Sequence, residues 1–343
     1  MMQAVVKREP GWGAELVSTP IPKVGPGQIL VRVLATSICG SDHHIYIWND
    51  WAKGRIKPPL TLGHEFAGEV VEVGEGVTQV SQGDRVSAET HVVCGYCSQC
   101  RTGHAHTCYN TKILGVDMDG AFAEYVALPA ENAWVNPPEL PVEIASVQEP
   151  FGNAVHTVLS GPVAGSSLVV LGCGPIGLFA VGIARACGAA RVYAVDTNDY
   201  RLELAEAMGA DLCLRADQVD PVRSIWEDNA GQGVDVALEM SGAVVAVQQS
   251  IEVVKPGGRV SLLGIPAEPV ALDLAEGVVM KGITLQGIAG RRMYETWYQT
   301  RALLSSGRVD IEPVITHRLP LSEFEKGMEL MGSGQCGKVI LTP

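Results

Sequence analysis

Residues 167–177 read SLVVLGCGPIG, a continuous apolar run followed at once by a glycine-rich turn. The turn has the spacing G-x-G-x-x-G, filled by Gly172, Gly174 and Gly177, and the chain after it has helical character up to Ala186. In a strand-turn-helix unit, the first glycine permits the tight turn, the second lets the backbone approach a pyrophosphate, and the third lets the helix pack closely. The helix N-terminus adds free N–H groups and a positive dipole end. This stretch predicts a dinucleotide-binding site.

An acidic residue follows the motif at the distance expected for a ribose contact. Asp196 lies nineteen residues after Gly177, at the end of the strand predicted over 191–195. A carboxylate there accepts hydrogen bonds from the ribose hydroxyls of adenosine and repels a 2′-phosphate, which favours NAD over NADP. Arg201 has two interpretations: it binds the ribose and weakens this preference, or it lies on a helix surface.

The chain around the motif alternates between strand and helix patterns. Strand-type and helix-type runs follow one another in the ranges 167–171, 176–186, 191–195, 201–208, 234–238 and 259–263. Such alternation predicts an α/β fold with a doubly wound parallel sheet, covered by helices on both faces, over residues 151–290.

The rest of the chain has a different pattern. Short runs rich in Val and Ile between Gly and Pro, as at 29–35 and 69–73, predict a mostly-β domain over residues 1–150. Residues 291–343 combine a helical stretch around 294–305 with an extended end at Lys338-Val339-Ile340-Leu341. We expect this last segment to return to the mostly-β domain.

Length, charge and apolar content limit the class of protein. At roughly 150 residues per domain, 343 residues predict two domains. The 25 Lys and Arg residues are scattered among 38 Asp and Glu residues, and the net charge of −13 argues against binding to nucleic acid or to an anionic membrane surface. The N-terminal residues lack the apolar stretch of a signal peptide, and the uncharged, largely apolar run at 168–184 is broken by glycines. We expect no export, no membrane span and a cytoplasmic location.

Four of the nine cysteines crowd into one short segment. Cys94, Cys97, Cys100 and Cys108 give C-x2-C-x2-C-x7-C, a spacing that lets four thiolates converge on one tetrahedral ion. Four sulfurs close the coordination shell, so we expect a structural zinc in a lobe of residues 94–108. An iron–sulfur cluster is the alternative, although the segment lacks the Cys-Pro of bacterial ferredoxins. His104 and His106 lie inside the lobe and are candidate substitute ligands.

A second set of metal-ligating side chains is dispersed along the mostly-β part. Cys39 begins the run CGSDHH, His64 and Glu65 form the run GHE with Gly63, and Glu149 precedes Pro150. Taken singly, none of these residues identifies a site, because an isolated Cys or His is commonly a packed core residue.

Together, these motifs and their order resemble the zinc-dependent medium-chain alcohol dehydrogenase superfamily over essentially the whole chain. The resemblance implies a GroES-like catalytic domain, a Rossmann domain, and a catalytic zinc bound by Cys39, His64 and an acidic ligand. Glu65 is either that ligand or a neighbour of it, and Glu149 either ligates zinc or lies one water away and moves protons. The chain lacks the second thiolate of the Cys2His set, which departs from the simple-alcohol branch.

The resemblance also implies roles for other residues. Ser41 is implied as the first hydroxyl of a proton relay that passes the cofactor ribose and leaves through His44, because histidine is a side-chain type suited to exchanging protons. A homotetramer is implied too, and the edge strands of the Rossmann domain could build it by pairing. Further cofactor contacts are implied at Ile176, Leu263, Gly264, Ile265, Gly287 and Ile288.

Two segments favour one substrate within the superfamily. Residues 148–157, QEPFGNAVHT, and 46–51, YIWNDW, resemble the branch that oxidises the 3-hydroxyl of L-threonine to 2-amino-3-ketobutyrate. Polyol dehydrogenases share the Cys, His-Glu and Glu arrangement, so a sorbitol-type or other secondary-alcohol activity is the alternative. A non-catalytic sensor that binds NAD and zinc is a third interpretation, and the intact Ser41 and His44 pair argues against it.

Overall fold

The structure, a computed structural model, describes all residues from 1 to 343. Contacts divide the chain into two compact units, which we call unit 1 (Met1–Glu149 with Ile315–Pro343) and unit 2 (Pro150–Val314). The first boundary lies one residue from the predicted one. The second differs from the expectation, because residues 291–314 pack within unit 2 and only the chain from Ile315 onward returns to unit 1.

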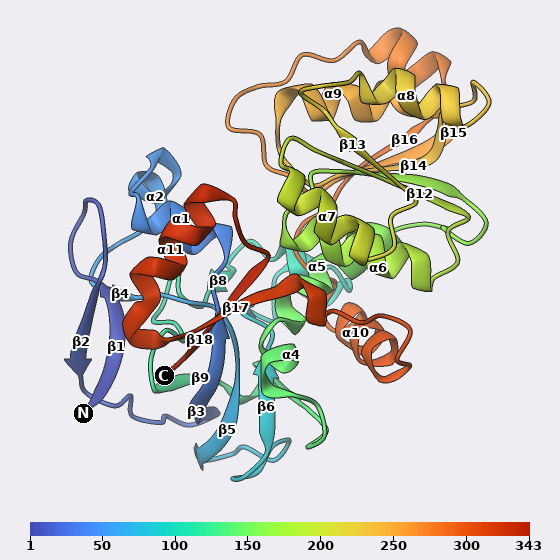
Figure 1. The fold of residues 1–343 in the computed structure, drawn as a ribbon. Coiled ribbons are helices and arrows are strands. Elements are labelled where there is room, and N and C mark those ends of the chain that lie inside the picture. The colour runs from blue at the N-terminus through green and yellow to red at the C-terminus, as the bar shows by residue number, and fades with distance from the viewer. The chain divides into compact units, whose positions relative to one another are not determined.

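Unit 2 contains the predicted parallel sheet. Its six strands have the order β13-β12-β11-β14-β15-β16, and every neighbouring pair is parallel. Helices α6 and α7 cover one face of the sheet, and α8 and α9 cover the other (Figure 1). The elements are β11 (Ser167–Leu171), α6 (Pro175–Ala186), β12 (Arg191–Asp196), α7 (Asp199–Ala207), β13 (Leu212–Arg215), α8 (Pro221–Asp228), β14 (Val234–Glu239), α9 (Val244–Val253), β15 (Val254–Leu262), β16 (Thr284–Gly287) and α10 (Glu295–Ser305).

Residues 167–177, which contain the glycine motif, form the centre of this unit. All five residues of β11 are buried, as expected for a strand with neighbours on both edges and helices on both faces. Gly174 is the N-cap of α6 and Pro175 is its first residue, where the missing N–H of proline is no loss. The turn between strand and helix is therefore fixed by the residues that spell the motif.

Unit 1 is built mainly from antiparallel sheets. The largest has the strand order β10-β6-β5-β3-β18-β17, with β9 also paired to β3, and a smaller sheet has the order β2-β1-β4. The strands are β1 (Met2–Lys7), β2 (Glu15–Thr19), β3 (Gln28–Ser37), β4 (Leu60–Thr61), β5 (Glu65–Val73), β6 (Arg85–Ala88), β7 (His91–Val92), β8 (Lys112–Ile113), β9 (Tyr125–Pro129), β10 (Ala133–Val135), β17 (Ile315–Pro320) and β18 (Lys338–Thr342). The helices are α1 (Gly40–Tyr46), α2 (Asp50–Arg55), α3 (Ser98–Arg101), α4 (Val142–Ser146) and α11 (Phe324–Ser333), and α5 (Gln148–Leu159) begins at the unit boundary.

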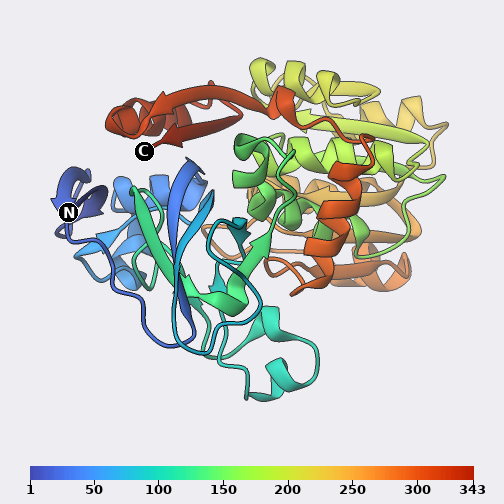
Figure 2. The same ribbon diagram turned by 90° about the horizontal axis from the view of Figure 1, so that it is seen from below.

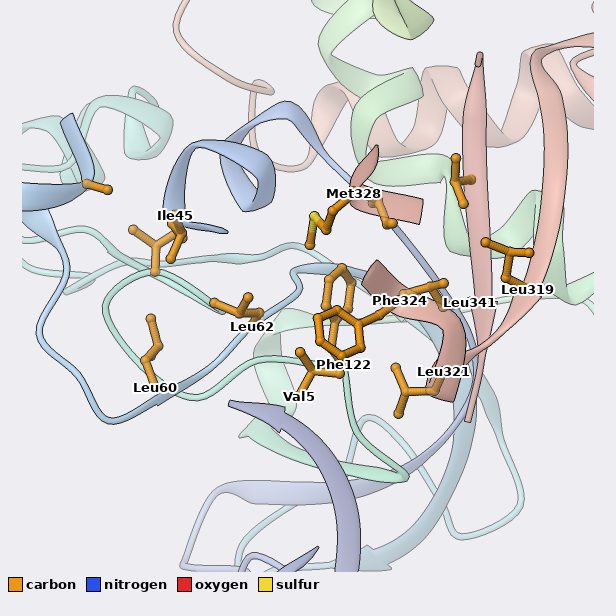
Figure 3. Packing of buried hydrophobic residues seen from close by; sticks show 14 of the residues in the cluster. Val5, Ile45, Leu60, Leu62, Phe122, Leu319, Leu321, Phe324, Met328 and Leu341 are labelled. Atoms are coloured by element: carbon orange, nitrogen blue, oxygen red, sulfur yellow. The ribbon is translucent and has the colours of Figure 1, made fainter. Parts of the chain in front are cut away.

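The C-terminal segment is part of the core of unit 1. Strand β18 is antiparallel to β3, so the expected return of residues 338–341 is confirmed. Phe324 and Met328 of α11 pack in one buried cluster with Val5 and Phe122 from early in the chain (Figure 3). The two ends of the sequence thus share one hydrophobic core.

The four-cysteine segment stands out from the sheets of unit 1, as the turquoise loop in Figure 2 shows. None of the helices of the structure is both long and apolar enough to cross a membrane.

Candidate active site

The lobe of residues 94–108 brings four sulfur atoms together. The Sγ atom of Cys97 lies 3.5 Å from the Sγ atom of Cys100 and 3.8 Å from that of Cys108. The Sγ atoms of Cys108 and Cys94 are 3.6 Å apart. Around one ion at a Zn–S distance of about 2.3 Å, tetrahedral geometry places sulfurs about 3.8 Å apart. None of the four forms a disulfide, so their thiolates fit a single zinc ion.

Local backbone makes this convergence feasible. Cys97 caps the short helix α3, which carries Cys100, and Gly95 has φ +75°, a conformation that glycine adopts without strain. Backbone N–H groups of Cys94 and Asn110 donate to the sulfur of Cys108. His104 and His106 are not among the residues whose ligand atoms converge.

The dispersed set also comes together, within unit 1. The ligand atoms of Cys39, His64 and Glu65 all lie within 4.8 Å of one another. Cys39 caps helix α1 at its N-terminus, and Glu65 begins strand β5. A three-ligand set of sulfur, nitrogen and oxygen suits zinc and leaves a coordination position open for substrate.

Asp42 organises this cluster, and the sequence argument had given it no role. Its carboxylate accepts hydrogen bonds from the backbone N–H of Cys39 (2.9 Å) and of Gly63 (3.3 Å), and so ties the two ligand segments together. The buried Nδ1 of His64 lies 3.6 Å from Asp42 and has no hydrogen-bond partner. Burial by itself lowers the pKa of His64, but the charges of Asp42 and Cys39 raise it well above its usual value. The negative charges of Asp42 and Cys39 that raise this pKa also suit the cluster to a bound metal ion, which would compete with the proton for His64.

Glu65 forms a buried ion pair with Lys338. The Lys338 ammonium lies 2.6 Å from one carboxylate oxygen and also binds the other, to which the Ser37 hydroxyl donates. Both charged side chains are almost completely excluded from solvent. Lys338 donates in addition to the carbonyl of Ile38, next to Cys39. The pair fixes the Glu65 carboxylate at the edge of the metal-binding cluster.

Lys338 sits among several negative charges of unit 1. Burial acts to lower its pKa, but Glu65, Cys39 and Glu149 together raise the pKa above the usual value. The Glu149 carboxylate accepts a hydrogen bond of 3.2 Å from the Thr90 hydroxyl and is not one of the three converging ligands. The structure therefore brings Glu149 near the cluster without adding it to the ligand set.

The two residues of the implied proton relay lie on one short helix. Ser41 is half-buried in the first turn of α1, and His44 is exposed three residues later. The Nδ1 atom of His44 lies 3.1 Å from the side-chain amide of Asn49. An exposed imidazole that is oriented by a neighbouring amide is suited to exchanging protons with solvent.

In unit 2, Asp196 lies against the glycine motif. Gly172 has φ +99°, which the tight turn requires. The Asp196 carboxylate accepts hydrogen bonds from the backbone N–H of Cys173 (2.7 Å) and of Asn198 (3.0 Å). Arg201 lies 3.9 Å from the same carboxylate, next to the predicted ribose contact.

The other predicted cofactor contacts lie at the same edge of the sheet. Gly177 lies so close to the turn that a Cβ on it would be only 2.0 Å from the carbonyl oxygen of Gly172, so the position requires glycine. Ligands of doubly wound sheets bind at the carboxyl ends of the strands. The loop that leaves β15 at this edge carries Leu263, Gly264 and Ile265, Gly287 ends β16 and Ile288 follows it. Gly174 is the N-cap of α6, and Ile176 lies in its first turn.

Comparisons with known proteins agree with this geometry. Residues 25–138 match the alcohol dehydrogenase GroES-like domain, and residues 175–306 match the zinc-binding dehydrogenase domain. The L-threonine 3-dehydrogenase of Caldanaerobacter subterraneus is 56% identical over 100% of this chain and 99% of its own length. A zinc-binding dehydrogenase from Sinorhizobium meliloti, solved with NADP, has a TM-score of 0.93 and 31% identity, over 100% of this chain and 99% of that one. An alcohol dehydrogenase from Escherichia coli CFT073, solved with NADH, has a TM-score of 0.92 and 29% identity with the same coverage. This chain therefore belongs to the zinc-binding dehydrogenases with an alcohol dehydrogenase GroES-like domain.

Proposed function

We propose that this chain oxidises the 3-hydroxyl of L-threonine to 2-amino-3-ketobutyrate while reducing NAD to NADH. The observation that carries the substrate is its 56% identity, over the full length of both chains, to a curated L-threonine 3-dehydrogenase. The convergence of Cys39, His64 and Glu65 supports the chemistry, because oxidation of a secondary alcohol needs both a Lewis acid and a hydride acceptor.

The proposal assigns a task to each residue of the unit 1 cluster. Cys39 and His64 would bind a catalytic zinc, with Glu65 or Glu149 as the acidic ligand. A zinc bound there would act as a Lewis acid and lower the pKa of the substrate hydroxyl. Ser41 would accept the hydroxyl proton while passing its own proton on, by way of the cofactor ribose, to His44, which would release a proton to solvent. The four cysteines of the lobe would bind a second, structural zinc, giving two ions per chain.

The substrate is tested by following NADH absorbance with L-threonine and with sorbitol in parallel. We expect the kcat/KM for L-threonine to exceed that for sorbitol by at least about a hundredfold, because a site built to bind an ammonium and a carboxylate group discriminates strongly against a molecule that lacks both. Turnover of sorbitol without turnover of L-threonine would show that the proposed substrate is wrong and that the chain oxidises polyols. NADH binding without any turnover would favour the sensor.

The preference for NAD rests on Asp196. Asp196→Gly is expected to lower the ratio of kcat/KM values for NAD and NADP by about tenfold or more, because it removes a charge that repels the 2′-phosphate. Asp196→Asn is the matched variant, since it keeps an acceptor for the Cys173 N–H and removes only the charge. An unchanged ratio in both variants would show that Asp196 does not lie at the ribose.

Assembly and location complete the proposal. Strand β16 is the open edge of the unit 2 sheet, and a segment just before it exposes Val279 and Met280 by 71% and 73%. An unpaired strand edge beside exposed apolar side chains suits pairing with a second copy of the chain. We propose a homotetramer that uses this edge, located in the cytoplasm, where cysteines that form no disulfide stay reduced.

A further inference from the structure

Glu239 is a completely buried acidic residue at the carboxyl end of strand β14. Its Oε1 atom accepts three hydrogen bonds from the loop that follows: from the backbone N–H of Ser241 (2.8 Å), from the Ser241 hydroxyl (2.5 Å) and from the backbone N–H of Gly242 (2.9 Å). Its Oε2 atom is buried without a hydrogen-bond partner. Burying a carboxylate in this way is unfavourable unless the hydrogen bonds it makes compensate, so its presence calls for an explanation.

The carboxylate holds its loop against the first glycine of the dinucleotide motif. A Cβ on Gly172 would lie 2.7 Å from the Cβ of Ser241 and 2.9 Å from its backbone nitrogen. The loops that leave β11 and β14 are therefore in direct contact, and the three hydrogen bonds to Glu239 set the position of Ser241 at this contact.

The loop that leaves β15 meets the same residue. The backbone N–H groups of Leu263 and Gly264 donate to the carbonyl oxygen of Glu239, at 2.9 and 3.1 Å. A Cβ on Gly264 would lie 2.5 Å from the Oε2 atom of Glu239 and 2.1 Å from the backbone nitrogen of Gly242. Three loops at the cofactor edge of the sheet thus meet at Glu239 and Ser241.

The position of these loops indicates which half of a dinucleotide they serve. Asp196, the predicted ribose contact on the adenosine side, belongs to β12, on one side of the central strand β11. Strands β14 and β15 lie on the other side of β11. In a doubly wound sheet each side accommodates one mononucleotide half, so the loops held by Glu239 face the nicotinamide half.

We propose that Glu239 is a positioning residue that fixes the loops at 241–242 and 263–264 for the nicotinamide half of the cofactor. The inference rests on the proposed use of NAD. Glu239 makes no contact with the cofactor itself, because its free oxygen is buried beneath Gly264.

The test compares two ligands that differ by the nicotinamide half, NADH and 5′-AMP. For Glu239→Ala, we expect the Kd for NADH, measured by fluorescence titration, to rise about tenfold, since three charge-assisted hydrogen bonds that order the loop are lost. The Kd for AMP, measured by calorimetry, should stay within about threefold. In steady-state kinetics of the same variant, the KM for NAD should rise in parallel with the Kd for NADH. The KM for L-threonine should change by less than about twofold.

Two further variants separate positioning from loss of stability. Glu239→Gln keeps an acceptor oxygen for the Ser241 and Gly242 N–H groups and is expected to restore NADH affinity to within about threefold of the wild-type value. Val236→Ala truncates a buried side chain of the same strand, away from the three loops, and should destabilise the chain without weakening NADH binding. If Glu239→Ala does not fold, Ser241→Ala removes one of the three donors and should weaken NADH by about threefold without affecting AMP.

Equal weakening of AMP and NADH would overturn the proposal, as would unchanged NADH binding in both folded variants, Glu239→Ala and Ser241→Ala. If the wild-type chain binds NADH but does not oxidise L-threonine, the proposed substrate is wrong. The comparison of NADH and AMP binding would still test the role of Glu239.

Discussion

Cys39→Ser is expected to lower kcat for L-threonine oxidation by about a thousandfold or more, while NADH affinity stays within about twofold of the wild-type value. A metal ion acting as a Lewis acid contributes several kcal/mol, and each 1.36 kcal/mol corresponds to a factor of ten in rate. Serine is a much poorer zinc ligand than thiolate. The cofactor residues belong to unit 2, whereas Cys39 caps a helix of unit 1, so the two effects should separate.

The matched control for this variant is Cys187→Ser. Cys187 is also half-buried and unpaired, but it lies at the end of α6 in unit 2, outside both metal-ligand clusters. It should retain activity. Zinc measured by mass spectrometry should fall from two ions per chain to one in Cys39→Ser and stay at two in Cys187→Ser. Full activity of Cys39→Ser would show that Cys39 is not a ligand of the catalytic metal.

Lys338→Met is expected to lower the free energy of unfolding by about 3–5 kcal/mol, the usual effect of removing one partner of a buried ion pair. The variant leaves the Glu65 carboxylate buried with only the Ser37 hydroxyl as its remaining side-chain donor. Methionine has a similar length to lysine, so the loss comes mainly from the uncompensated charge. Urea unfolding, followed by circular dichroism, measures the change.

Two variants decide whether the buried charge is responsible. Lys338→Met combined with Glu65→Gln removes both charges and should recover a large part of the lost stability. Arg8→Met breaks an ion pair with Glu15 whose side chains are 62% and 59% exposed, and such a pair contributes at most about 1 kcal/mol. A loss in Lys338→Met no larger than that in Arg8→Met would mean that the pair does not stabilise unit 1.

Local patterns predicted much of unit 2. The motif at 172–177 fixes a turn between a buried strand and a helix within eleven residues, so propensity and periodicity suffice to place it. The same holds for β12, and for the helix predicted near 294–305, which the structure places at Glu295–Ser305. The position of that helix in unit 2 was not predictable in this way, because the tertiary contacts of a helix leave no signal in its own periodicity.

Long-range polar contacts were beyond the reach of sequence reasoning. Lys338 and Glu65 are separated by 273 residues and meet only because β18 pairs with β3 beside β5. Asp42 lies within the quoted CGSDHH run, yet its bond to the Gly63 N–H depends on two loops meeting in space. Glu239 likewise reads as an ordinary strand end, and only the convergence of three loops gives it a role.

The most direct test of the central claim is the fate of the hydrogen on C3 of the substrate. L-threonine carrying deuterium at C3 is incubated with the chain and NAD, and the mass of the NADH that forms is measured. The account predicts NADH that is one mass unit heavier than the product from unlabelled threonine. Unlabelled NADH, or none at all, would contradict it.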